Sequence, residues 1–339
     1  HDKLGGALGN YLSSRMIPAL KSSLQGKDWD VTPYVNVFNE VPEKGFVQFL
    51  DSPRYSTGYA ALWSTLGIMI ETHMLKPYKD RVEGTYRTLL SIIDIAERDR
   101  PTIKDLRDRA QRRFLTERFY PLNYKVDSTR VSKLQFKGYE AETIESEVTG
   151  QERLKYDTTK PFTQEIDYYD NFVPGNLIEI PRAYVIPQAW WNVLDNLKNN
   201  EIEITPLAND TVMQVEVYHI ADYNTRNNTY EGHYPHFNTT VTTSVDSVFF
   251  RKGDLYIKTF QPGVRYLLET LEPTATDSFF NWNLFDSILQ QKEGFSPYVF
   301  EDVAKDLLEK NPELKEAFEE KKREDREFSD NGYAQLDWL

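Results

Sequence analysis

Apolar residues recur at helical spacing over long segments in the first third of the chain. From Leu4 to Leu24 they occupy every third or fourth position, and Gly26 offers a stop. This spacing is typical of an amphipathic helix. Lys79 to Ala96 repeats the pattern and predicts a second helix. The charged segment Glu97 to Arg118 predicts a solvated connecting helix.

Two other segments in the same third are apolar without helical spacing. Pro33 to Phe38 is short, as a strand would be. Leu66 to Leu75 is almost continuously apolar until Glu71 and ends before Pro77. Such a run is typical of a strand buried on both faces, and we expect the helix Lys79 to Ala96 to cover it.

After Tyr120 the pattern changes to short alternating runs separated by turn residues, which is typical of a sandwich-like β-rich domain. The predicted strands are Leu122–Val126, Val131–Tyr139, Met213–Ile220, Val241–Phe250 and Leu255–Thr259.

Helical segments interrupt and follow these strands. Gln188 to Leu197 and Phe279 to Gln291 are predicted helices within the β-rich part. Phe300 to Phe328 predicts two amphipathic helices that are broken at Asn311 and Pro312, an N-cap followed by a proline in the first helical position. Their dense charges of both signs indicate solvated helix faces.

Length and composition limit the possibilities. The chain has 339 residues and a net charge of −13. The length favours two domains, and the negative charge opposes binding to nucleic acid. The absence of cysteine excludes disulfides and thiolate sites. Apolar stretches such as 60–70 are too short for a transmembrane segment, and no signal peptide is visible ahead of the first helix, so we expect a fragment or processed form.

Glu71 is the most informative candidate for chemistry. A carboxylate directly after a buried apolar strand must be paired, be protonated or point into a cleft at the strand's carboxyl end. In a cleft it would serve as a general base; as a structural ion pair it would not. His73, His233 and His236 do not form a metal site by spacing, and we expect the last two to be exposed in a loop.

Several strings resemble the carboxypeptidase A-like zinc metallopeptidase family, in particular exported relatives of the Bacteroidetes type. They are HDKLGG, TPYVNVF, SPRYSTGYAAL and ETHMLKPYKDRVE in the first part, and AYVIPQAWW, VEVYHI and YEGHY in the second. The resemblance implies an α/β fragment, the second half of a carboxypeptidase-like mixed sheet with helices, followed by the β-rich domain. We predict a catalytic part over 1–100, a connecting helix over 101–120, the β-rich domain over 121–298 and a helical tail over 299–339.

The resemblance also implies roles for individual residues. In this family a glutamate near the end of the catalytic domain activates zinc-bound water, and Glu71 matches it by position. Tyr55 or Tyr59 would be the mobile tyrosine that covers the substrate, and Arg54 would meet a carboxylate bidentately. The His-x-x-Glu motif that holds zinc is missing, so we assign no metal ligand here, not even His1, and expect zinc only in a full-length family member.

The resulting expectation is a fragment of a zinc metallocarboxypeptidase-type hydrolase that acts on a peptide or related amide substrate and is inactive alone. By resemblance, it would be extracytoplasmic in a bacterium: periplasmic, secreted or envelope-associated. The alternative is a non-catalytic binding or scaffold protein of the bacterial envelope that docks a peptide, glycan or envelope partner through aromatic side chains of the β-rich domain. The sequence leaves the substrate and the oligomeric state open.

Overall fold

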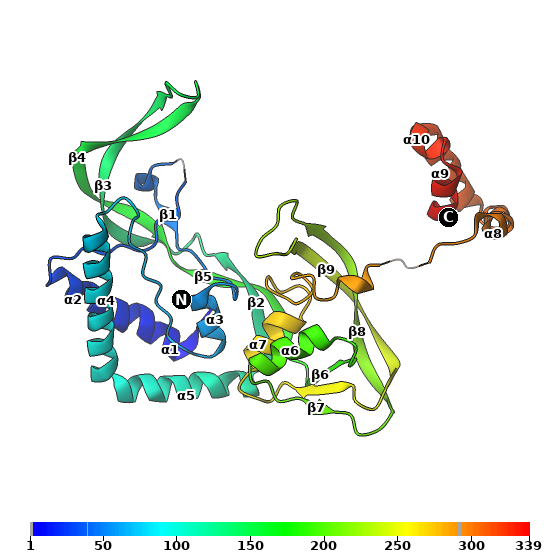
Figure 1. Cartoon of the computed structure of the whole chain (residues 1–339), viewed down its shortest axis with the longest axis horizontal. Helices are drawn as coiled ribbons and strands as arrows, with labels where there is room; N and C mark the ends of the chain where they lie inside the picture. Colours follow the sequence, from blue (N-terminus) through cyan, green and yellow to red (C-terminus); the bar gives the residue numbers. More distant parts are fainter. Residues whose placement is uncertain (1–2, 39, 291–292) are drawn as a thin grey trace. The chain divides into compact units, whose positions relative to one another are not determined.

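The computed structural model describes residues 3–38, 40–290 and 293–339. The chain divides into two compact units, His1–Phe285 and Asp286–Leu339. The described residues combine α-helices with several small β-sheets (Figure 1), which confirms the mixed helix and strand content predicted from the sequence.

Helices near the N-terminus form where their spacing predicts them. The first is continuous but changes its winding, running through α1 (Gly6–Tyr11), the π-helical turn η1 (Leu12–Met16) and α2 (Ile17–Gln25). It packs against α4 (Tyr78–Arg98), and α5 (Arg100–Thr116) follows directly. Their shared core contains Leu8, Met16, Leu24 and Ile95. The three helices predicted in this part of the chain are confirmed.

The predicted strands of the first third are wrong. Residues 33–37 and 65–73 lie outside helices and strands, and neither segment belongs to a β-ladder within the described residues. Leu66 and Ile68 pack against the core of the helices, whereas the side chain of Met69 is 48% exposed. The apolar residues of this segment therefore reflect contacts with helices on one side, not burial within a sheet. Between the two segments lie the 3-10 turn η2 (Pro42–Lys44), the short strand β1 (Phe46–Val47) and α3 (Ser56–Leu62).

The strands within the described residues form four small sheets. β3 (Ser132–Glu145) and β4 (Glu152–Tyr169) make a long antiparallel ribbon, to which β1 adds in parallel. β2 (Phe119–Val126) pairs with β5 (Phe172–Glu179), and β8 (Thr211–Thr225) pairs with β9 (His236–Phe250), both antiparallel. In the fourth sheet β10 (Leu255–Lys258) lies between β6 (Ala183–Ile186) and β7 (Thr205–Pro206).

All five predicted strands after Tyr120 are present, but the long strands β4 and β5 and the short strands β6 and β7 were not predicted. Most side chains of β4 are exposed and many are polar, so the sequence shows no apolar alternation there. The helix α6 (Trp191–Asn199) is confirmed, and with α7 (Val264–Leu271) it packs on β6 and β10 around Val193, Leu197, Ile257 and Leu267.

The helix predicted from Phe279 to Gln291 is wrong within the described residues. Residues 279–285 form consecutive turns, and only the 3-10 turn η3 (Asp286–Ile288) follows; Gln291 lies outside the described residues. The reason lies in the turn itself: Asn283 has a φ of 64°, which interrupts a right-handed helix.

After the 3-10 turn η3, the described residues of the second unit form four α-helices: α8 (Pro297–Lys310), α9 (Pro312–Glu324), α10 (Arg326–Ser329) and α11 (Gly332–Trp338). The break at Asn311 and Pro312 is confirmed. The rings of Phe318, Phe328 and Trp338 contact one another and form the apolar centre of this small unit.

A buried group of charged side chains joins the N-terminal helices to the β-rich part of the first unit. On α7, Arg265 donates to the carbonyl oxygens of Lys3 and Ala61. One turn later, the Glu269 carboxylate accepts a hydrogen bond from the Tyr120 hydroxyl at 2.8 Å and pairs with Lys3 Nζ at 3.0 Å. Glu269 is fully buried and Arg265 is 2% exposed. Charges buried this deeply stay ionised only when partners replace water.

Tyr120→Phe should lower the free energy of unfolding of the chain by about 1–3 kcal/mol, because it removes a donor from a buried carboxylate and adds no other. Tyr139→Phe is the matched control, since Tyr139 is 45% exposed on β3. Urea unfolding followed by tryptophan fluorescence measures both. Equal, small effects for the two variants would show that the buried hydroxyl contributes nothing.

A second buried carboxylate, Glu272, accepts hydrogen bonds from the hydroxyls of Tyr184 and Tyr218. Burial raises the pKa of Glu272 above its usual value of 4.5. The folded chain therefore holds this proton to higher pH than the unfolded chain does. It follows that the free energy of unfolding falls as the pH rises from about 4.5 towards the folded-state pKa.

Glu272→Gln should remove this part of the pH dependence, because glutamine does not titrate. Urea unfolding at a series of pH values from 4 to 7 (about the range in which a raised carboxyl pKa acts) tests this. Glu145→Gln, at an exposed strand end, is the control and should keep the wild-type slope. The same slope in Glu272→Gln would contradict the assignment.

Candidate functional site

Glu71 lies in the extended segment that joins α3 to α4 and is exposed to solvent. The sequence placed it at the end of a buried strand, and this placement is wrong because no neighbouring strand pairs with the segment. Among the described residues, the backbone groups of 66–72 form no hydrogen bond with another backbone group. His73, two residues on, accepts a hydrogen bond at Nδ1 from the amide of Leu75 at 3.2 Å. The segment therefore presents an accessible carboxylate on an otherwise unpaired backbone.

Residues 3–38, 40–290 and 293–339 contain no cluster of three or more histidine, aspartate or glutamate side chains that could hold a metal ion. The remaining histidines serve other contacts. His219 Nε2 lies 3.0 Å from Ser244 Oγ, and His236, which is buried rather than exposed as predicted, lies 2.8 Å from Thr225 Oγ1 through Nδ1. The described residues thus do not fit a zinc ion.

The loop that carries Arg54, Tyr55 and Tyr59 leads into α3. Gly58 in its first turn lies so close to the loop that a Cβ there would be 2.0 Å from the carbonyl oxygen of Ser52. Only glycine permits this approach. The ring of Tyr55 packs edge-on against Phe49, and the hydroxyl of Tyr59 donates to Asn200 Oδ1. Partial burial raises the pKa of Tyr55, and the neighbouring Tyr230 phenol adds to the rise.

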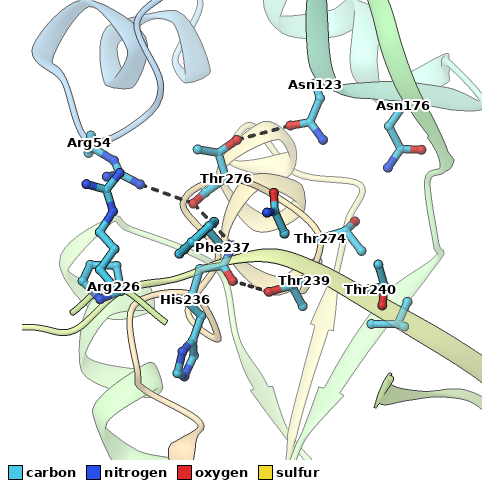
Figure 2. A pocket seen from close by; sticks show the side chains of 14 residues that line it. Arg54, Asn123, Asn176, Arg226, His236, Phe237, Thr239, Thr240, Thr274 and Thr276 are labelled. Carbon is cyan, nitrogen blue, oxygen red and sulfur yellow. Dashed lines mark hydrogen bonds between the residues drawn. The ribbon is translucent and has the colours of Figure 1, made fainter. Parts of the chain in front are cut away.

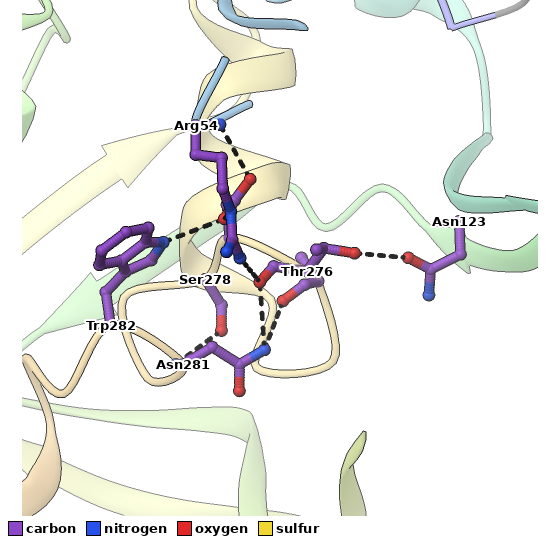
Figure 3. Close-up of polar contacts among 8 residues, drawn as sticks. Arg54, Asn123, Thr276, Ser278, Asn281 and Trp282 are labelled. Carbon is purple, nitrogen blue, oxygen red and sulfur yellow. Dashed lines mark hydrogen bonds and ion pairs between the residues drawn. The ribbon is translucent and has the colours of Figure 1, made fainter. Parts of the chain in front are cut away.

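Arg54, for which the resemblance implied contact with a substrate carboxylate, pairs with a carboxylate of the chain itself. Its Nε donates to Asp277 Oδ1 at 2.7 Å and its backbone amide donates to Oδ2 at 2.9 Å. Trp282 Nε1 donates to the same Oδ1, and the guanidinium lies over the Trp282 ring at 5.1 Å (Figure 3). Arg54 therefore fastens the loop before α3 to the turns after α7.

Next to this ion pair is a polar pocket of about 570 Å³ (Figure 2). Neither Glu71 nor the two candidate tyrosines line it. Its walls come from five distant parts of the sequence, and most of its side chains are amides or hydroxyls. The lining residues include Arg54, Asn123, Asn176, Arg226, Thr240 and Thr274.

Asn281 holds the inner wall of the pocket in place. Its Oδ1 accepts a hydrogen bond from Thr239 at 2.6 Å, its Nδ2 donates to the carbonyl of Ala275 at 2.8 Å, and its carbonyl accepts from the amide of His236. Thr276 then donates to Asn123 Oδ1 at 3.2 Å. Sequence reasoning missed this site, because its residues lie far apart and asparagine and threonine are common in turns. The only local signal was the aromatic string from Phe279 to Trp282.

Comparison of the chain with known protein families, curated proteins and solved structures found no match. None of the helices in the described part of the chain has the length and apolar character needed to cross a lipid bilayer.

Asp277→Ala should destabilise the first unit by about 3–5 kcal/mol, since it leaves the guanidinium of Arg54 without its carboxylate in a site where both side chains are largely buried. Asp105→Ala, which breaks an exposed pair with Arg109 on α5, is the control and should change stability little. Thermal unfolding compares the two. A similar, small loss in both variants would show that the Arg54–Asp277 pair does not fasten the loop.

Proposed function

We propose that this chain is part of a zinc metallocarboxypeptidase-type hydrolase that cleaves peptide or related amide bonds, with Glu71 as its general base. The strings around SPRYSTGYAAL and ETHMLKPYKDRVE carry the resemblance on which the proposal rests. The finer fold, half of a carboxypeptidase-like mixed sheet followed by a sandwich-like domain, is part of the same proposal.

The structural observation that supports this proposal best is the position of Glu71. The carboxylate is exposed on a segment that directly precedes α4, and α4 packs on the N-terminal helix through α2. The resemblance implies an N-terminal helix, a strand that ends in Glu71 and a closing helix; the two helices and the glutamate between them follow this order, but the segment that carries Glu71 is not a strand. An exposed carboxylate remains available to a substrate, whereas a structural ion pair would occupy it; the described residues include no ion-pair partner for Glu71.

The chemistry assigned to this chain is proton transfer. Glu71 would accept the proton of an attacking water and return it to the leaving amine, a role that typically contributes about 10²–10⁴-fold to a rate. Because the described residues do not fit a zinc ion, the metal that the family uses has to be held by residues outside them. By the same resemblance we propose an extracytoplasmic location in a bacterium, in the periplasm, outside the cell or at the envelope.

The second proposal is a binding or scaffold protein of the bacterial envelope that acts through its β-rich part. The polar pocket and the exposed aromatic side chains near it favour this function. Phe237, at the start of β9 and in the pocket lining, is 40% exposed, and Tyr234 just before it is 51% exposed. An exposed aromatic ring beside polar groups offers a ligand an apolar surface to pack against, while the polar groups form hydrogen bonds with it.

Glu71→Gln in the longest natural chain that contains this sequence should lower kcat for peptide hydrolysis by about 10²-fold or more, because glutamine cannot accept the proton. Bound zinc, measured by atomic absorption, should not change. The control is Glu83→Gln, a partly exposed glutamate on α4 whose ion-pair partner within the described residues is Lys79.

Full activity in Glu71→Gln would remove Glu71 from the mechanism. Equal losses in the Glu71 and Glu83 variants would indicate a general effect of charge on this surface and would also contradict the assignment.

A further inference from the structure

The side chains on the inner wall of the polar pocket already have hydrogen-bond partners, whereas most of those on its rim do not. Asn281, Thr239 and Thr276 use their side chains in hydrogen bonds within the chain. On the rim, the side chains of Asn176, Thr240 and Thr274 have no hydrogen-bond partner among the described residues, and only the oxygen of the Asn123 amide is used. The rim thus offers both donors and acceptors around a preformed cavity.

The charged side chains that line the pocket are all positive. Its lining contains Arg54 and Arg226 and no aspartate or glutamate. Arg54 is neutralised by Asp277, as described above. Arg226 is exposed at the end of the β8–β9 ribbon, and within the described residues it forms no ion pair. Figure 2 shows both arginines at one end of the pocket and Asn123 and Asn176 at the other. One guanidinium is therefore available to a carboxylate, which it binds well through paired N–H groups.

Two strand pairs bring the rim residues of the pocket together. Asn123 and Asn176 are opposite each other in the β2–β5 ladder, and Thr240 is opposite Asp222 in the β8–β9 ladder. The groups that line the pocket are mostly side-chain amides and hydroxyls. A compact ligand with many hydroxyl groups matches such a lining, because each hydroxyl both donates and accepts hydrogen bonds.

We propose that this pocket binds a saccharide that carries a carboxylate, with Arg226 contacting the carboxylate. Asn176, Thr240 and Thr274 exchange hydrogen bonds with the hydroxyl groups of the sugar, and the half-exposed ring of Phe237 lies against its C–H face. This proposal rests on the second proposed function, binding by the β-rich part, and specifies the class of ligand. It is independent of Glu71.

Isothermal titration of the whole chain with three probes tests the proposal. D-glucuronate carries both features, D-glucose lacks the carboxylate, and acetate lacks the hydroxyl groups. We expect glucuronate to bind with saturation and both other probes to bind about tenfold or more weakly, the usual effect of losing a charge-assisted or several neutral hydrogen bonds.

Two variants separate the parts of the site. Arg226→Gln should weaken glucuronate about tenfold or more and leave glucose unchanged, because only the carboxylate contact is lost. Thr240→Val should weaken both sugars. The control Arg153→Gln alters an exposed arginine on β4, away from the pocket lining, and should bind glucuronate as the wild type does.

Binding of acetate as tight as that of glucuronate would overturn the saccharide assignment. Glucuronate binding that is unchanged in Arg226→Gln would overturn the carboxylate contact while leaving a binding function in place. No saturation by glucuronate would overturn the inference, and peptide hydrolysis by the longest natural chain would then be judged separately by the Glu71 variant.

Discussion

The first unit depends on how α7 accommodates two buried charges. Arg265 and Glu269 lie one helical turn apart on a helix in which every residue from Val264 to Thr270 is buried. Charges in such a place are costly unless polar or charged partners replace water. Here the partners come from Lys3, Ala61 and Tyr120, so the N-terminus, the end of α3 and the start of β2 must all reach the same face of α7. The requirement to satisfy these charges holds the helical and β-rich parts together.

Apolar packing around α7 also holds the helical and β-rich parts of the first unit together. Tyr266 and Leu267 face the core formed with α6, β6 and β10, whereas Val264 and Leu268 face a second cluster with Phe114 and Tyr120. Because α7 contributes to both clusters, the turns that follow it begin from a fixed position. Those turns carry Asp277 and Asn281, which in turn fix Arg54 and the inner wall of the pocket. The position of the pocket is thus a consequence of the packing of one helix.

The two candidate sites differ in how they are built. Glu71 lies on a segment that makes few backbone contacts, so its geometry can change when another element approaches it. The pocket, in contrast, has its inner residues tied by hydrogen bonds between buried side chains, as at Thr239 and Asn281. A preformed site loses less conformational entropy when a ligand binds. The pocket therefore suits recognition, while the glutamate segment suits a role that needs a further element of structure.

The sequence by itself determined the helices from Leu4 to Leu24, from Lys79 to Ala96 and after Pro297, because helical hydrogen bonds are local and their apolar spacing is visible in any window. It also located most strands after Tyr120. Only the tertiary structure decided that 66–72 is not a strand, since an apolar run becomes a strand only when a neighbour supplies the backbone partners. The same holds for the pocket: Arg54, Asn123, Arg226 and Asn281 acquire a common role only through long-range contacts, which no local pattern records.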